Sequence, residues 1–211
     1  MRPRMICLHA SEANVEIIDR EMKEMPFDIK HEVDTHLLSM IRSKQPLELQ
    51  KAYVVEQLNK LMLQEPALLF VTCTNYVALI DEINVTTHIP ILKIDEILYE
   101  QLKGIHNPIK MLFTNKETIR GTMQRFRQFV SEDIEVEVLH IPDVFDWYLA
   151  GDTLRHDQKV LMTLLELDAY ENTVVVAQLS MSRIASIYSK LSGNEVLSPV
   201  TALKEYMNKL I

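Results

Sequence analysis

The chain has 211 residues, which is enough for one large domain or for two lobes of about 100 residues each. Its apolar fraction of 47% and its charged fraction of 25% are those of globular proteins, which excludes disordered and fibrous classes. A formal net charge of −8, without a stripe of basic residues, argues against nucleic-acid partners and against anionic membrane surfaces.

The counts of glycine and cysteine exclude further classes. The four glycines stand too far apart for a dinucleotide fingerprint or a P-loop. Two cysteines, Cys7 and Cys73, cannot build a disulfide framework. The apolar run after Arg4 is too short for a signal peptide, and no run reaches the length of a membrane span. We therefore expect a cytoplasmic protein without a membrane partner.

Short apolar runs alternate with longer amphipathic stretches along the first half of the chain. The predicted elements, in chain order, are a strand over 4–8, a helix over 14–25, a strand over 28–33, a helix over 46–64, a strand over 67–71 and a helix over 75–83. Such an alternation favours a parallel sheet with crossover helices.

Helix start signals occur in the second half of the chain. Thr114 with Glu117 predicts a capping box, and Ser198 with Pro199 predicts a helix that begins with proline at its first position. Further along the helix that follows Thr114, three arginines are predicted to form a solvated face: Arg120, Arg125 and Arg127.

The chain also aligns weakly with itself when it is shifted by 105 residues. Residues 5–9 fall on 110–114, residues 28–33 fall on 133–138, and residues 70–73 fall on 175–178. Three predicted strands in one register indicate a duplication.

A duplication predicts an α/β fold of two similar lobes related by a pseudo-two-fold axis, each a parallel sheet flanked by helices. We place the N-terminal lobe at 1–93 and the C-terminal lobe at 94–197, with 198–211 packing back on the first lobe. Ligands of parallel sheets bind beyond the carboxyl ends of the strands, so the site is expected in the cleft between the lobes.

Cys73 is the strongest candidate for chemistry because it ends a predicted buried strand and precedes a predicted helix. A thiol at a helix N-terminus can have a lowered pKa, and free backbone N–H groups there suit a carboxylate. Such a thiol can remove a proton next to a carboxylate or act as a nucleophile. A buried cysteine that packs as a small apolar side chain is the alternative.

The triplet Cys73-Thr74-Asn75 after the third strand of a duplicated α/β chain resembles the aspartate/glutamate/hydantoin racemase superfamily. The resemblance covers nearly the whole chain. It implies a cofactor-independent enzyme of amino acid metabolism, an isomerase that uses one cysteine from each lobe. One thiolate removes the α-proton, and the opposite thiol returns a proton to the other face.

The resemblance also implies roles for individual residues. Cys73 matches the cysteine of the first lobe, and Thr74 and Asn75 match the neighbours that hold the substrate carboxylate. Thr114 and Asn115 follow the first strand of the second lobe, where the family places polar groups that bind substrate.

The chain departs from this pattern at Gln178, which stands where the family has its second cysteine. Glutamine exchanges no proton near neutral pH, and Cys7 lies inside a predicted core strand. Three interpretations stay open. Cys73 acts as the single base of an isomerase or decarboxylase, or as a covalent nucleophile, or the chain is a binding protein for a small carboxylate that has lost racemase activity.

Several other polar residues are candidates for the site. His9 follows the first strand and could supply an acid–base group, although a histidine there is more often a hydrogen-bonded loop residue. Ser11, Thr72 and Ser180 could bind substrate oxygens, and Gln178 could orient the substrate. The histidines have no metal-ligand spacing, so we expect no metal. The resemblance implies that no cofactor is needed. The expected partners are a small carboxylate and, as a default, a second copy of the chain.

Overall fold

The computed structural model describes residues 2–83, 85–131, 133–167 and 171–209. The chain forms two compact units, Met1–Ile94 and Asp95–Ile211, and each is described by itself. None of the helices in the described ranges is long and apolar enough to cross a membrane.

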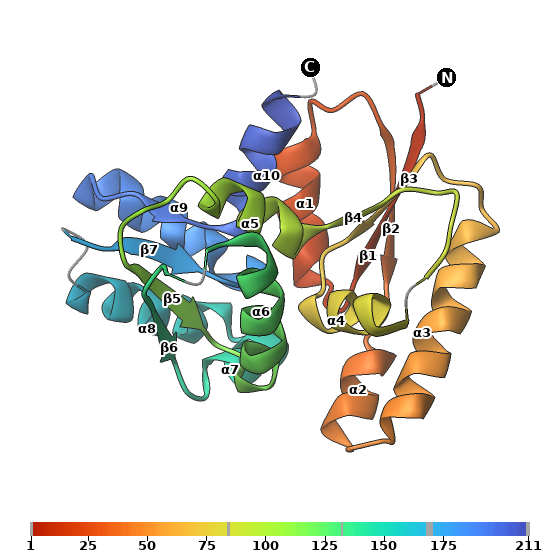
Figure 1. The fold of residues 1–211 in the computed structure, drawn as a ribbon, viewed down its shortest axis with the longest axis horizontal. Coiled ribbons are helices and arrows are strands. Elements are labelled where there is room, and N and C mark those ends of the chain that lie inside the picture. Colours follow the sequence, from red (N-terminus) through yellow and green to blue (C-terminus); the bar gives the residue numbers. More distant parts are fainter. Residues whose placement is uncertain (1, 84, 132, 168–170, 210–211) are drawn as a thin grey trace. The chain divides into compact units, whose positions relative to one another are not determined.

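The first unit alternates strands with helices (Figure 1). Its elements are β1 (Arg4–His9), α1 (Ala13–Met22), β2 (Asp28–Val33), α2 (His36–Arg42), α3 (Leu47–Met62), β3 (Leu68–Val71), α4 (Thr74–Ile83) and β4 (Ile91–Lys93). The strand predicted over 28–33 is confirmed at both ends, and the other five predicted elements are confirmed within three residues at either end.

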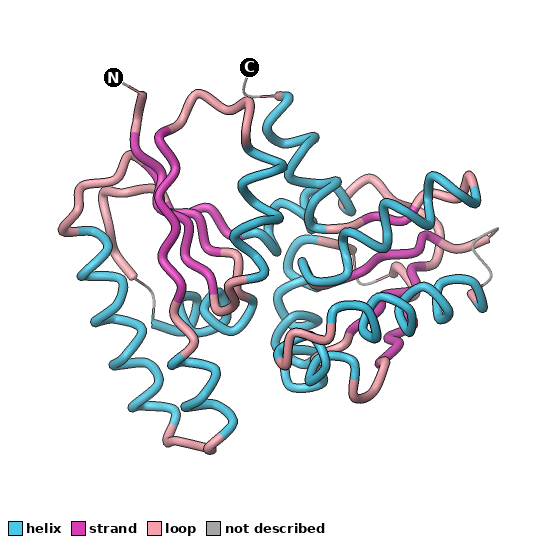
Figure 2. Tube along the Cα trace, turned by 180° about the vertical axis from the view of Figure 1, so that it is seen from behind, coloured by secondary structure: helices cyan, strands magenta, loops and turns pink. Residues whose placement is uncertain are grey.

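The strands of the first unit form a parallel sheet in the order β2-β1-β3-β4. Successive side chains of a strand point to opposite faces of the sheet. The buried residues of β1 therefore cover both faces. Ile6 and Leu8 pack in one core cluster with buried side chains of α2, α3 and α4. Figures 1 and 2 show α1 on the opposite face of this sheet, where its buried side chains include Ile18 and Met22.

The second unit repeats the alternation. Its elements are α5 (Ile94–Leu102), β5 (Ile109–Phe113), α6 (Lys116–Phe129), β6 (Val136–His140), α7 (Val144–Leu149), α8 (Thr153–Glu166), β7 (Thr173–Val176), a 3-10 turn (Leu179–Met181), α9 (Ser182–Ser192), β8 (Val196–Leu197) and α10 (Pro199–Asn208). Helix α10 begins as predicted, with a capping box between Ser198 and Thr201 and proline at its first position.

The strands of the second unit form a parallel sheet in the order β6-β5-β7-β8. Leu112 and Val176, on one face, belong to a core cluster with buried side chains of α7, α8 and α9. The two units therefore have the same strand order, which confirms the prediction of an α/β fold with two similar parallel sheets.

The shift of 105 residues holds for two of the three strands that revealed it. Shifting the first residue of β1 by 105 gives the first residue of β5. Shifting both ends of β3 by 105 gives both ends of β7. The third strand differs: β6 begins at Val136, three residues after the predicted Asp133. Alternating polar and apolar residues fit a strand in either place, so the pattern alone does not fix its ends.

The predicted solvated face of α6 is wrong at Arg125. This side chain is buried, and its Nη2 donates to Oδ2 of Asp95 on α5 at 2.7 Å, with both groups at least nine-tenths buried. The phenol of Tyr99 on α5 also donates to the carbonyl oxygen of Thr122 at 3.2 Å. The second unit therefore joins α5 to α6 through a buried ion pair and a buried hydrogen bond.

Removing one charge of this pair should destabilise the protein strongly. In Asp95→Asn the guanidinium of Arg125 stays buried without its counter-charge, so we expect a loss of about 3–5 kcal/mol in the free energy of unfolding. Chemical denaturation measures this loss, and replacing both residues (Asp95→Leu with Arg125→Met) should recover much of it. A single variant as stable as the wild type would contradict the role of the ion pair.

Candidate functional site

Cys73 lies between the end of β3 and the first turn of α4, as the sequence predicts. Its carbonyl oxygen accepts a hydrogen bond from the backbone N–H of Val77 at 3.0 Å, so the residue already belongs to the helix. The side chains of Thr72 and Cys73 are buried, whereas Thr74 and Asn75 are half-buried in the first turn of α4. The thiol thus lies at the positive end of a helix, at the carboxyl edge of the sheet.

A group that the sequence did not reveal binds Tyr76, three residues after Cys73. Asp34, directly after β2, accepts hydrogen bonds from the phenols of Tyr53 and Tyr76 and, at 2.9 Å, from the backbone N–H of His36. Burial, the Asp34 carboxylate and a smaller contribution from Cys73 raise the pKa of Tyr76, so its phenol stays protonated. The signal in the sequence was the position of Asp34, one residue beyond a predicted strand.

His9 is the last residue of β1 and is fully buried. Its Nδ1 lies 2.8 Å from Oγ1 of Thr72, and its Nε2 lies 2.8 Å from Nδ1 of His31. Burial and the neighbouring His31 lower the pKa of His9 to about 3, so the ring is neutral at physiological pH. The structure brings His9 and Thr72 together, while the acid–base role predicted for His9 stays a prediction.

The spacing of residues along the chain predicts no metal ligands, but the parallel strand register brings three metal-ligating side chains together. Cys7, His9 and His31 offer one sulfur and two nitrogen atoms that lie within 4.8 Å of one another. Burial, with a smaller contribution from Asp19, raises the pKa of Cys7 to about 12. Pairing of β1 with β2 sets Cys7 opposite His31, which no spacing along the chain reveals.

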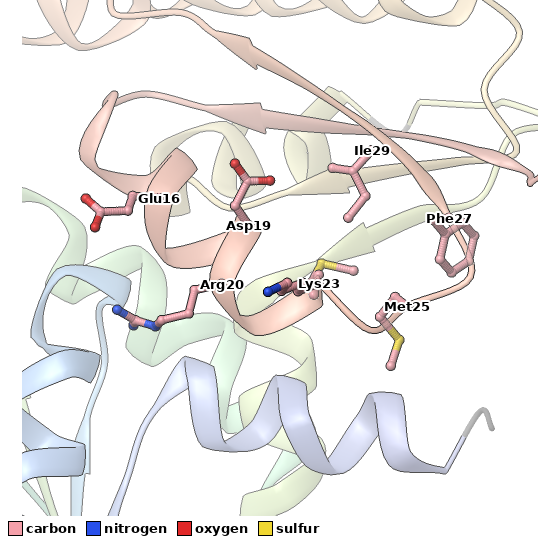
Figure 3. Close-up of a pocket in the computed structure, with 8 residues that line it drawn as sticks. Glu16, Asp19, Arg20, Lys23, Met25, Phe27 and Ile29 are labelled. Atoms are coloured by element: carbon pink, nitrogen blue, oxygen red, sulfur yellow. The ribbon is translucent and has the colours of Figure 1, made fainter.

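A surface pocket of about 490 Å³ opens beside this cluster (Figure 3). Glu16, Asp19 and Arg20 line it from α1, and Ile29 lines it from β2. Asp19 also accepts a hydrogen bond from Nε2 of His31 at 2.9 Å. The aspartate therefore connects His31, and through it the buried His9, to the pocket.

In the second unit, Gln178 follows β7 as Cys73 follows β3. Its side-chain Oε1 accepts hydrogen bonds from the backbone N–H of Thr114 at 2.7 Å, from the hydroxyl of Thr114 at 2.8 Å and from the backbone N–H of Asn115 at 3.0 Å. The amide oxygen of Gln178 therefore fixes the loop between β5 and α6, a role that sequence reasoning missed.

The other predicted residues of the second unit also have local partners or buried positions. Asn115, rather than the predicted Thr114, caps α6, because its Oδ1 accepts from the backbone N–H of Glu117 at 3.1 Å. Ser180 lies in the 3-10 turn after Gln178, and its buried Oγ has no hydrogen-bond partner among the described residues. In the first unit, Ser11 lies half-buried in the turn between β1 and α1.

Solved structures with the same fold include three racemases. A glutamate racemase from Thermus thermophilus, in complex with β-chloro-D-alanine, matches 99% of this chain and 80% of its own length, with a TM-score of 0.72 and 12% identity. An aspartate racemase from Picrophilus torridus matches 98% of this chain and 93% of its own, with a TM-score of 0.75 and 13% identity. An allantoin racemase from Pseudomonas fluorescens matches 98% and 90%, with a TM-score of 0.63 and 10% identity.

These three proteins fall in the aspartate/glutamate/hydantoin racemase superfamily, so the resemblance seen in the sequence is confirmed at the level of the fold. No protein-family model and no curated protein sequence matches the chain. The likeness is therefore carried by the structure rather than by sequence identity.

The hydrogen bonds of Gln178 predict a contrast between two substitutions. Gln178→Leu leaves the N–H groups of Thr114 and Asn115 without their acceptor, so we expect a loss of about 2–4 kcal/mol in the free energy of unfolding. Gln178→Glu keeps an oxygen acceptor at the N-terminus of α6, and its loss should stay below about 1 kcal/mol. Urea denaturation of both variants tests this contrast; equal losses would show that the acceptor oxygen is not what matters.

Proposed function

We propose that this protein is a cofactor-independent enzyme of the aspartate/glutamate racemase type, which acts at the carbon next to the carboxylate of an amino acid or a small dicarboxylate. The observation that carries the proposal is the position of Cys73, a thiol at the start of α4 and at the carboxyl edge of a parallel sheet. The shared fold with glutamate, aspartate and allantoin racemases supports the same reaction class.

In this proposal Cys73 acts as the base. Its thiolate takes the α-proton, so an S–H bond forms while the Cα–H bond breaks, and the electron pair is delocalised into the carboxylate. Return of the proton from sulfur to carbon completes the exchange. The start of α4 stabilises the thiolate and the substrate anion through its backbone N–H groups.

The proposal assigns the binding of substrate oxygens to the polar residues near the strand ends. These residues are Ser11, Thr72, Thr74, Asn75, Thr114, Asn115 and Ser180. The unpartnered buried hydroxyl of Ser180 supports its inclusion, because a ligand oxygen would supply the missing hydrogen bond. Tyr76, three residues after Cys73, is fully buried and donates its phenol O–H to Asp34, so we assign it no contact with the substrate.

Gln178 limits the chemistry to one thiol. An amide has no proton to give at neutral pH, and its oxygen already accepts three hydrogen bonds. We therefore propose that Gln178 shapes the loop between β5 and α6 and orients the substrate. Exchange on one face of the α-carbon needs only Cys73, whereas inversion needs a further proton donor. The cytoplasmic location and a homodimer stay predictions.

Proton exchange in D₂O tests the proposal directly. Wild-type protein should exchange the α-proton of at least one compound in a panel of D- and L-amino acids, hydantoins and small dicarboxylates, followed by NMR together with chirality. Cys73→Ala should lower the exchange rate by about 10²–10⁴-fold, because it removes the base. Cys73→Ser should resemble Cys73→Ala, since an alcohol is a far weaker acid than a thiol.

Two controls make the result interpretable. Leu63→Ser changes a side chain that is 84% exposed in the same unit and should leave the rate unchanged. Thermal unfolding of the Cys73 variants should match the wild type, which excludes misfolding as the cause of lost activity. Absence of exchange with every compound, together with slow alkylation of Cys73 at neutral pH, would instead favour a carboxylate-binding protein.

A further inference from the structure

Three metal-ligating side chains meet on one face of the first unit's sheet. Cys7 and His9 are two residues apart on β1, so their side chains point to the same face. The parallel register places His31 of β2 directly beside Cys7. The ligand atoms of all three residues lie within 4.8 Å of one another.

The hydrogen bonds around His9 allow two positions for its ring proton. The hydroxyl of Thr72 can donate either to Nδ1 of His9 or to the carbonyl oxygen of Leu8, 3.1 Å away. In the second case Oγ1 of Thr72 accepts from Nδ1–H of His9, 2.8 Å away. In a neutral ring this leaves Nε2 of His9 with a lone pair.

The contact with Asp19 determines which nitrogen of His31 carries a proton. Its Nε2 lies 2.9 Å from Oδ1 of Asp19, and a carboxylate can only accept, so Nε2 carries a proton. In a neutral ring Nδ1 of His31 then has a lone pair as well. Nε2 of His9 and Nδ1 of His31 face each other at 2.8 Å. With a lone pair on each nitrogen a cation joins the two rings, whereas with the proton of His9 on Nε2 an N–H···N hydrogen bond joins them.

We propose that Cys7, His9 and His31 form a binding site for a zinc-class divalent cation. One thiolate and two imidazoles are ligands that Zn²⁺ prefers, and three protein ligands leave a fourth position for water. Bonds of about 2.1 Å to nitrogen and 2.3 Å to sulfur in a tetrahedron separate the ligand atoms by about 3.3–3.6 Å. The two nitrogens reach this spacing by moving apart by about 0.5 Å.

The groups behind the histidines match those of known metal sites. A ligating histidine typically donates its other N–H to a carboxylate or another oxygen, which orients the ring and makes it a better ligand. Asp19 accepts such a bond from His31, and Oγ1 of Thr72, 2.8 Å from Nδ1 of His9, is placed to accept one from His9. Both rings can then present to a metal the nitrogens that face each other.

Asp19 links the cluster to the pocket in Figure 3, which none of the three ligands lines. Cys7 and His9 are fully buried, but the side chain of His31 is 15% exposed and that of Asp19 is 62% exposed. Asp19 and Glu16 carry negative charge at the pocket wall, and Arg20 and Lys23 carry positive charge there. A hydrated cation can thus meet a carboxylate before it reaches the buried ligands.

An N–H···N hydrogen bond between the two neutral histidines is the competing arrangement. It joins the two nitrogens equally well, but it gives no role to a third donor. The sulfur of Cys7 lies within 4.8 Å of both nitrogens, and sulfur is a ligand for a soft or borderline metal. The set of three donors therefore favours the cation. This inference does not rest on the proposed function, because Cys73 takes no part in it.

Cobalt(II) is the probe for the test, since it replaces zinc and reports its ligands by absorption. Full-length protein, freed of metal by a chelator, should bind one Co²⁺ per chain with the d–d bands of a tetrahedral site and a sulfur-to-cobalt charge-transfer band. Zn²⁺ should displace it and raise the thermal midpoint, because it binds only the folded chain. Cys7→Ser should abolish the charge-transfer band, while the matched Cys73→Ser should keep it.

Two further variants separate the parts of the site. His31→Gln should abolish tight cobalt binding. Asp19→Asn keeps the three ligands but changes the group that accepts a hydrogen bond from His31, so it should weaken cobalt binding by about ten- to hundredfold. Asp19 is exposed, so this variant stays informative even where changes at buried Cys7 prevent folding. A folded wild type that binds no Co²⁺ or Zn²⁺ at submillimolar concentration overturns the proposal. A charge-transfer band that is lost in Cys73→Ser and kept in Cys7→Ser also overturns the proposal.

Discussion

The parallel pairing of β1 between β2 and β3 is the constraint on which the rest of the first unit depends. The backbone bonds of this pairing continue past the strands: Asp34 donates to the carbonyl of His9 at 2.8 Å, and Thr72 donates to the carbonyl of Leu8 at 3.0 Å. These bonds hold the residues that follow three strands at one edge of the sheet. Polar groups from distant parts of the chain become neighbours there because the ladder leaves them no other position.

The second unit has the same backbone hydrogen bonds beyond its strands, but the side chains that follow its strands differ. Ile141 and Ala177 donate to the carbonyls of Phe113 and Leu112, as the corresponding residues do in the first unit. Where the first unit has a thiol at the start of a long helix, the second has an amide whose oxygen binds the neighbouring loop. A sulfur atom is a poor acceptor for two backbone N–H groups, so the two positions serve different purposes on similar backbones.

Much of the fold was predictable because the buried strands are short apolar runs and the helices repeat with the period of an α-helix. The position of Cys73 followed from the same pattern. Its neighbours were harder to predict, since contacts such as Cys7 with His31 depend on strand register, which local sequence does not encode. The burial of Arg125 also escaped prediction, because its partner Asp95 lies 30 residues away on another helix.

The amide of Gln178 constrains the mutational paths that are open to the chain. A cysteine at this position would end too far from the backbone of Thr114 and Asn115 to accept their hydrogen bonds, so a second thiol could arise only with a change in that loop. A chain in which only Gln178 is replaced by cysteine would be less stable than the present chain. Selection for stability alone can thus keep the two units chemically different, whatever the reaction requires.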